Sequence, residues 1–307
     1  MERTFSHIPV MLDQCMEWLG VASGRNFLDG TLGGGGHSRR ILELSSPAGR
    51  LAGLDRDPRA LEAARANLKQ FGERALFFEG NFSEMVRIGA GIPFAIHGVL
   101  LDLGVSSPQI DWPQRGFSFQ IDGPLDMRMG STSLTAAEVV NRYSLQDLVK
   151  IFRDYGQERF SGKIARAIVR AREKTPISST GQLARVITAT GPAMPTKTLS
   201  RIFQAIRIEV NDELGSLQKG LQAALDILAP GGRLVVLTYH SLEDGLLKEF
   251  LRSQADPCTC SKELPYCICG RKPAVRVLHR KPIVPEAGEV ELNPRARSAH
   301  LRAAEKI

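Results

Sequence analysis

A glycine-rich run, Gly30–Gly36, follows a short apolar stretch that ends in Asp29 and precedes His37. α/β proteins hold nucleotides where a buried strand turns through glycines into a helix, because glycine lets the backbone approach a ligand and the helix N-terminus carries partial positive charge. Two common spacings do not fit. A dinucleotide fingerprint needs a glycine where Ser38 or Arg39 stands, and a P-loop needs a Gly-Lys-Ser/Thr that does not follow. The run therefore predicts a nucleotide-like ligand without a pyrophosphate, or only a tight turn.

Carboxylates lie at or near the C-terminal ends of three of the predicted strands: Asp29, Asp55 and Asp102. An acidic residue at the tip of a second strand, such as Asp55, is well placed to accept both hydroxyls of a ribose. Phe82 follows the third strand and falls on the same edge of the sheet. A ribose-bearing ligand without a pyrophosphate site points to S-adenosylmethionine, although any one of these residues could instead cap a helix or shape a turn. The predicted strands are 26–29, 50–55, 75–78 and 98–103, alternating with helices 38–44 and 58–71.

The stretch after Asp102 offers groups for the methyl acceptor. Enzymes that methylate an exocyclic amine often carry Ser/Asn/Asp-Pro-Pro-aromatic at this position, to hold and aim the weakly nucleophilic amine. Ser107-Pro108 matches half of that pattern, and the aromatic residues of 115–119 could supply the missing ring. A Ser-Pro pair can also be a simple turn. Carbon methylation of a pyrimidine would need a cysteine nucleophile beside the site. Cys15 precedes the predicted strands and the other four cysteines lie near the C-terminus, so carbon methylation is rejected.

The strand–helix alternation stops after Asp102 and resumes at a predicted strand, 233–239, behind a turn at 230–232. One continuous helix is predicted from Val210 to Leu228. The sequence therefore predicts an α/β fold, a class I (Rossmann-like) methyltransferase sheet interrupted by an all-helical domain. The predicted divisions are 1–111 and 207–307 for the methyltransferase domain and 112–206 for the helical RNA-binding insertion.

Positive charge is concentrated in the insertion. Residues 159–207 hold one acidic side chain, Glu173, and ten basic ones, so this segment alone exceeds the +7 of the whole chain. Phe160, Ile164 and Ile168 recur every four residues and predict the apolar stripe of a basic amphipathic helix. The segment is typical of a phosphate-contacting surface, or of a solvated helix face. The ten basic residues are Arg159, Lys163, Arg166, Arg170, Arg172, Lys174, Arg185, Lys197, Arg201 and Arg207.

Composition excludes several other classes of protein. With 43% apolar and 24% charged residues the chain is globular, and no apolar run is long enough to span a membrane. The N-terminus lacks the pattern of a secretory signal, which favours a cytoplasmic protein.

Four of the five cysteines form two Cys-x-Cys pairs, Cys258/Cys260 and Cys267/Cys269, within the segment 258–269. Four thiolates this close could hold a structural zinc ion, although Cys-x2-Cys is the usual zinc spacing. Reduced thiols on a hairpin and a disulfide formed during purification are the alternatives.

Several longer motifs point the same way, and together they span nearly the whole chain. The motifs are 29–38, 55–58, 102–109, 115–119, 123–129, 240–244 and 293–297. In these motifs the chain closely resembles the bacterial small-subunit ribosomal RNA (cytosine-N4)-methyltransferase family, known as RsmH or MraW.

The resemblance implies N4-methylation of a cytidine in the decoding region of 16S ribosomal RNA of the small ribosomal subunit. S-adenosylmethionine would be the donor, and Asp102, Ser107 and Pro108 would face the substrate. One departure is visible: Gly34 stands where some members have arginine, a change that leaves the donor loop its other glycines. The implied donor contacts are Gly35, Gly36, His37, Asp55, Phe82, Asp102 and Gln109.

Overall fold

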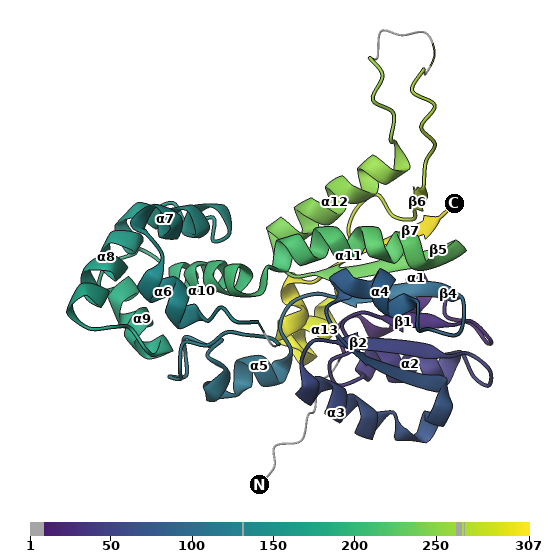
Figure 1. Ribbon diagram of the computed structural model, residues 1–307, viewed down its shortest axis with the longest axis horizontal. Helices are drawn as coiled ribbons and strands as arrows, with labels where there is room; N and C mark the ends of the chain where they lie inside the picture. The colour runs from purple at the N-terminus through teal and green to yellow at the C-terminus, as the bar shows by residue number, and fades with distance from the viewer. Residues whose placement is uncertain (1–8, 131, 262–265, 267) are drawn as a thin grey trace. The chain divides into compact units, whose positions relative to one another are not determined.

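The computed structural model describes residues 9–130, 132–261, 266 and 268–307. The chain forms two compact units, one of residues up to Gly104 together with Leu214–Ile307, the other of Val105–Glu213 (Figure 1). The expected insertion, 112–206, lies inside the second unit, which extends seven residues further at each end. At the C-terminal end the reason is Asn211, whose side chain bonds the backbone of Met127 and Met129 and so ties the end of its helix to the insertion.

The first unit is built on a seven-stranded sheet with the strand order β3-β2-β1-β4-β5-β7-β6. The first five of these strands are parallel, and β7 runs antiparallel to both β5 and β6. The strands are β1 (Phe27–Asp29), β2 (Leu51–Asp55), β3 (Ala75–Glu79), β4 (Ile96–Asp102), β5 (Leu228–Thr238), β6 (Val275–Val277) and β7 (His300–Lys306).

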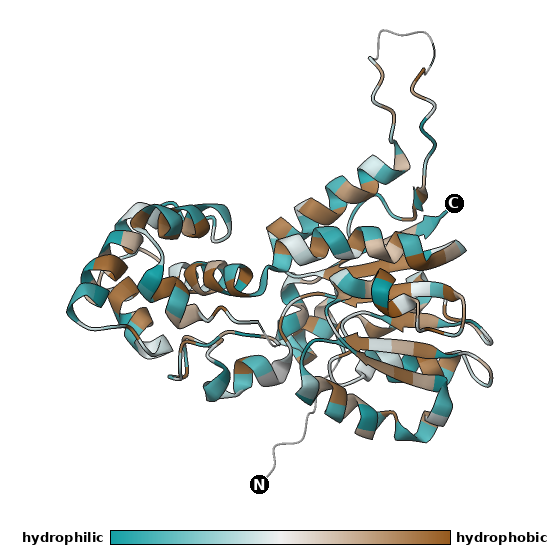
Figure 2. Cartoon of the chain, in the orientation of Figure 1, coloured by the Kyte–Doolittle hydropathy of each residue, from teal (hydrophilic) through white to brown (hydrophobic). Residues whose placement is uncertain are grey.

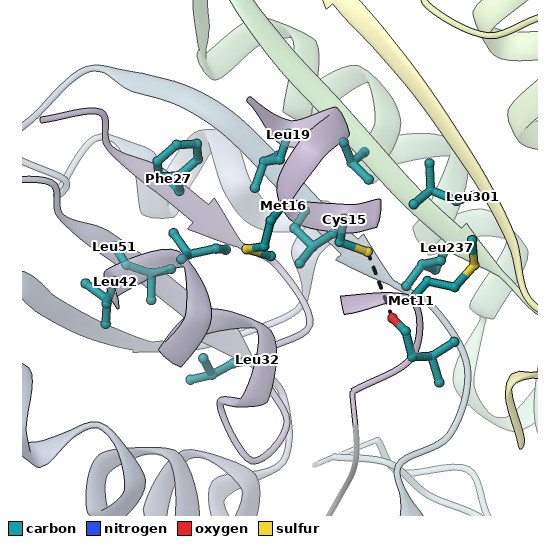
Figure 3. Close-up of a cluster of buried hydrophobic side chains, with 14 of the residues drawn as sticks. Met11, Cys15, Met16, Leu19, Phe27, Leu32, Leu42, Leu51, Leu237 and Leu301 are labelled. Atoms are coloured by element: carbon teal, nitrogen blue, oxygen red, sulfur yellow. Dashed lines mark hydrogen bonds between the residues drawn. The ribbon is translucent and has the colours of Figure 1, made fainter. Parts of the chain in front are cut away.

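Helices cover both faces of this sheet. Successive strand residues point to opposite faces, so Phe27 and Leu100 pack in one core whereas Leu28 and Leu101 pack in the other. Figure 3 shows the first core, in which α1 side chains such as Leu19 lie beside strand residues. Because both faces are buried, the central strands are mostly apolar, as the brown stretches of the sheet in Figure 2 show. The helices are α1 (Leu12–Leu19), α2 (Gly36–Leu44), α3 (Pro58–Asn67), α4 (Met85–Gly89), α11 (Glu213–Ile227), α12 (Ser241–Ala255) and α13 (Ala287–Leu292), with 3-10 turns η1 (Lys69–Arg74), η2 (Phe82–Glu84) and η4 (Pro294–Ser298).

The second unit is helical, with a core of its own around Phe152, Ile164 and Ile202. Within its described residues no strand occurs, and the bridge between Pro124 and Ser179 is the one sheet-like pairing. Its elements are α5 (Ser107–Asp111), η3 (Pro113–Arg115), α6 (Ala136–Arg142), α7 (Leu145–Asp154), α8 (Ser161–Lys174), α9 (Thr180–Thr188) and α10 (Pro195–Asn211).

The predicted α/β sheet with an all-helical insertion is confirmed, and three local predictions are wrong. The single helix from Val210 to Leu228 is two helices, because Asp212 adopts a left-handed conformation (φ 45°, ψ 47°) between α10 and α11. The turn at 230–232 lies inside β5 as an irregularity, since Leu228 already pairs with Ile96 of β4. Phe160 precedes α8 and is 60% exposed, so it does not belong to the apolar stripe. Among the described residues, no helix could cross a membrane.

Candidate active site

The carboxyl ends of β1, β2 and β4 bring the predicted carboxylates to one edge of the sheet. Asp29 at the end of β1 pairs in register with Gly53 of β2 and Leu100 of β4. Asp55 and Asp102 therefore each extend two residues beyond Asp29 on the neighbouring strands. This edge is where open parallel sheets bind their ligands.

Asp29 anchors the glycine loop. Its carboxylate, 1% exposed, accepts hydrogen bonds from the Ser38 hydroxyl at 2.7 Å and from the Thr31 backbone N–H at 3.1 Å. Burial raises the pKa of Asp29, and these hydrogen bonds oppose that rise. Ser38 lies in the first turn of α2, so Asp29 fixes the start of that helix to the end of β1 and acts as a structural support.

Two positions of the loop require glycine. Gly35 has a φ of 81°, a left-handed conformation that L side chains rarely adopt. A Cβ at Gly36 would lie 2.5 Å from Cγ of Pro9. The loop leads into α2, whose first N–H groups have no partner within the helix. The role of this loop in binding the donor stays a prediction.

Asp55 is held by two backbone donors. Its Oδ2 accepts from the Gly33 N–H at 2.8 Å and its Oδ1 from the Asp57 N–H at 2.9 Å. Burial nevertheless raises the pKa of Asp55 to about 6, against those two hydrogen bonds. A diol that donates to this carboxylate would stabilise the charged form further.

Asp102 joins a chain of polar contacts at the end of β4. Its Oδ1 accepts a hydrogen bond from the Tyr239 hydroxyl at 2.6 Å, and its Oδ2 lies 3.7 Å from Nδ1 of His37. The other ring nitrogen of His37, Nε2, lies 2.9 Å from the Val10 carbonyl oxygen. Burial and the charge of Asp102 raise the pKa of Tyr239 well above its usual value, so the hydroxyl stays a donor.

Tyr239 was not among the residues that the sequence predicted for the site. It follows β5 directly, and β5 is parallel to β4, so its position at the end of a strand was the available signal. Phe82, which was predicted, begins η2 and lies close to the start of the glycine run. A Cβ built on Gly30 would come 3.2 Å from Cβ of Phe82, and one built on Gly220 of α11 would come 2.3 Å from its ring. The ring is partly buried and packs against the core that contains Leu28 and Leu101.

The predicted residues divide between the two units. Asp55, His37, Phe82 and Asp102 belong to the first unit together with the glycine loop, whereas Ser107, Pro108 and Gln109 belong to the second. The Oε1 of Gln109 accepts a hydrogen bond from the Ser106 N–H at 2.9 Å, which closes the first turn of α5. Ser107 and Pro108 lie in α5, and their side chains are outside the described set. Their roles, and that of Gln109, stay predictions.

Cys15 is unsuited to nucleophilic attack. The thiol is completely buried in α1, with Sγ 4.0 Å from the Val10 carbonyl oxygen (Figure 3). Burial and the nearby charge of Asp102 raise the pKa of Cys15 well above its usual value. The thiolate form that attack requires is therefore disfavoured.

The basic segment of the insertion separates into two groups. Arg172 bonds the carbonyl oxygens of Val140 and Tyr143, while Arg201 and Arg207 pair with Glu158 and Glu213, so these three stabilise the insertion itself. Lys163, Arg166, Arg170 and Lys174 recur every three or four residues along α8 and form an exposed ridge. Within the described residues none of the four takes part in a salt bridge. The exposed members of the original ten are Arg159, Lys163, Arg166, Arg170, Lys174, Arg185 and Lys197.

Comparison with known proteins gives a consistent result. A model described as the MraW methylase family matches residues 4–307. The chain is 50% identical over 308 residues to the ribosomal RNA small subunit methyltransferase H of Carboxydothermus hydrogenoformans, covering 99% of this chain and 98% of that protein. It is 51% identical to the protein of the same name from Geobacter sulfurreducens, covering 99% of this chain and all of that protein.

Solved structures are more distant. An rRNA methylase from Streptococcus thermophilus has a TM-score of 0.43 at 11% identity, covering 98% of this chain and 99% of that one. The fibrillarin of Aeropyrum pernix, in complex with natively bound S-adenosyl-L-methionine, has a TM-score of 0.39 at 10% identity, covering 92% and 67%.

Proposed function

The chain belongs to the MraW methylase family, and from that premise we propose that it methylates N4 of a cytidine in the decoding region of 16S ribosomal RNA. Membership makes it a class I, S-adenosylmethionine-dependent methyltransferase that acts on small-subunit ribosomal RNA. The single observation that carries the proposal is the match, over 99% of this chain, to proteins named ribosomal RNA small subunit methyltransferase H. The cytidine, its N4 atom and the cytoplasmic location are our inference.

The described residues fit the donor, which supplies an electrophilic methyl group on a sulfonium. We assign the ribose hydroxyls to Asp55 and the adenine to Phe82. The backbone of Gly35 and Gly36 would contact the donor, while Leu68 and Pro9 pack on the sides of these residues where a Cβ would stand. The support for this assignment is the shared edge of the sheet and the buried, backbone-held carboxylate of Asp55.

Asp102 would hold the acceptor amine. The N4 lone pair of cytosine is conjugated into the ring, so a hydrogen bond from the amine to a carboxylate raises its nucleophilicity and aims it. Tyr239 occupies Oδ1 of Asp102, and Oδ2, which lies 3.7 Å from Nδ1 of His37, would accept the hydrogen bond from the substrate amine. Ser107 and Pro108 are proposed to complete the substrate-facing turn. No strong base is needed beforehand, because the amine loses its proton as the methyl arrives.

Two observations favour an amine of RNA as the acceptor. The buried, high-pKa thiol of Cys15 does not suit attack on C5 of a pyrimidine. The exposed basic ridge of α8 suits the phosphates of a structured RNA.

The deciding experiment is radiolabelled methyl transfer to small subunits that lack the modification, followed by nucleoside analysis. We expect label in N4-methylcytidine, and none with Asp102→Asn. Label in N6-methyladenosine or in ribosomal protein would instead identify another amine as the acceptor. Binding to subunits without any transfer would identify an assembly factor that retains the donor fold.

A further inference from the structure

Three cysteine thiols come together on the segment between α12 and β6. The sulfur atoms of Cys258, Cys260 and Cys269 all lie within 4.8 Å of one another, and those of Cys258 and Cys269 are 3.9 Å apart. Tetrahedral zinc with Zn–S bonds near 2.3 Å places its sulfurs about 3.8 Å apart. The described thiols are therefore close to the spacing that one zinc ion requires. The fourth cysteine of the sequence cluster, Cys267, lies outside the described residues.

Apolar packing does not explain how these thiols are held together. Two extended arms project beyond α12 and β6 in Figure 1, and their base is closed by a bond from the Ala274 N–H to the Gln254 carbonyl oxygen. Tyr266 is 73% exposed and Ile268 is 68% exposed. A segment without a core needs another kind of cross-link, and metal binding is a common one.

A backbone hydrogen bond also positions the sulfur of Cys260. The backbone N–H of Ile268 points to its sulfur at 3.4 Å, a hydrogen bond that crosses from one arm to the other. Hydrogen bonds of this kind to a ligand atom orient metal-bound groups. Soft sulfur ligands select zinc over magnesium or calcium.

We propose that Cys258, Cys260 and Cys269 bind one structural Zn²⁺ that closes this segment. The 15-residue helix α12 begins just after the catalytic edge of the sheet and ends before the cysteines. At a rise of 1.5 Å per residue this helix is about 22 Å long, and the cysteines follow its far end. The ion therefore has no part in methyl transfer. It fixes the arm that carries the exposed side chains of Arg271 and Lys272.

The test uses full-length protein purified with a reductant and without chelator. Elemental analysis should find about one zinc per chain, and Cys258→Ser/Cys269→Ser should lose it. The matched control is Thr259→Ala, which removes an exposed side chain between two of the cysteines and should keep the metal. Co²⁺ exchanged into the wild type should give sulfur-to-metal charge-transfer bands, and chelator should accelerate proteolysis of the segment.

Several results would overturn the proposal. These are metal-free protein that takes up neither Zn²⁺ nor Co²⁺, a Cys258–Cys269 disulfide in the freshly purified protein, or the visible absorption of an iron–sulfur cluster. None of these measurements depends on methyl transfer, so they separate the zinc site from the function proposed above.

Discussion

Asp55 illustrates how a single carboxylate is prepared for a ligand. It is buried at the end of β2, and burial raises its pKa to about 6 although two backbone N–H groups bond it. An unfolded chain would release this proton near pH 4. Because the folded protein retains the proton longer, the contribution of Asp55 to stability is lost as pH rises from about 4 to 6. The protein thus holds a charge at neutral pH that a donated hydrogen bond from a ligand would stabilise.

We therefore predict that donor binding depends on pH through Asp55. Affinity for S-adenosylmethionine should rise as pH increases from 5 to 7 and then level off, because the ribose hydroxyls need an ionised acceptor. Asp55→Ala should weaken binding by one to two decades, the equivalent of roughly 1.5–3 kcal/mol for a hydrogen bond to a charged group. Calorimetry across this pH range measures both effects. Unchanged affinity in a folded Asp55→Ala protein would remove Asp55 from the site.

Tyr239 offers a second test at the residue scale. Tyr239→Phe removes the 2.6 Å hydrogen bond to Asp102 and should lower the methyl-transfer rate about tenfold or more, as one charge-assisted hydrogen bond predicts. Donor affinity should change little. The control is Tyr143→Phe in the insertion, which removes a 2.7 Å bond to Glu209 by the same chemical change. Equal loss of rate in both variants would show a general loss of stability instead of a role at the site.

At the scale of elements, the sequence predicted the features that depend on neighbouring residues, and it did not predict those that depend on contacts between distant residues. The strands ending at Asp29, Asp55 and Asp102 were predictable because each is an apolar run closed by a carboxylate. The hydrogen bond between Tyr239 and Asp102 was not, since it joins residues 137 apart that only the β4–β5 pairing brings together. The break at Asp212 depends on one backbone conformation that an apolar helical pattern conceals.

The basic segment shows the same limit. Its charge was visible in the sequence, but Arg172, Arg201 and Arg207 are engaged inside the insertion, and only the fold separates them from the exposed ridge. The assignment of Asp55 to the ribose came from its place at the end of a strand, whereas the other donor contacts came from motif resemblance, and all of them stay predictions.

The exposed ridge of α8 can be tested as one element. Neutralising Lys163, Arg166 and Arg170 together to glutamine should weaken binding to small subunits. The log–log salt slope should fall by up to about 0.9 for each phosphate that is no longer neutralised. Donor affinity should be unchanged. An unaltered slope would leave the ridge as a solvated surface.

A control of equal charge change is available for that experiment. Arg87, Arg153 and Arg252 are exposed, and each already pairs with a neighbouring carboxylate. Changing all three to glutamine should leave the salt slope close to that of the wild type. A matching decrease in the control would attribute the effect to net charge and not to α8.

The whole molecule consists of two units with separate cores, which predicts that the insertion can fold alone. Val105–Glu213 has its own apolar cluster and falls within the usual size of a domain. The isolated fragment should unfold cooperatively on heating and should bind ribosomal RNA fragments without binding S-adenosylmethionine. Circular dichroism and a filter-binding titration test both statements. A fragment without a cooperative transition would show that the insertion needs the sheet unit to fold.

The position of β7 has a consequence for how the protein is made. This strand pairs with β5 on one side and β6 on the other, yet it follows both in the chain. Synthesis proceeds from the N-terminus, so the helical insertion leaves the ribosome and can fold while β5 still has an unpaired edge. Such an edge is a template for pairing with other chains. The nascent sheet is therefore exposed to aggregation until residues 300–306 emerge. The time that the ribosome takes to release this last strand determines how long the edge of β5 stays unpaired.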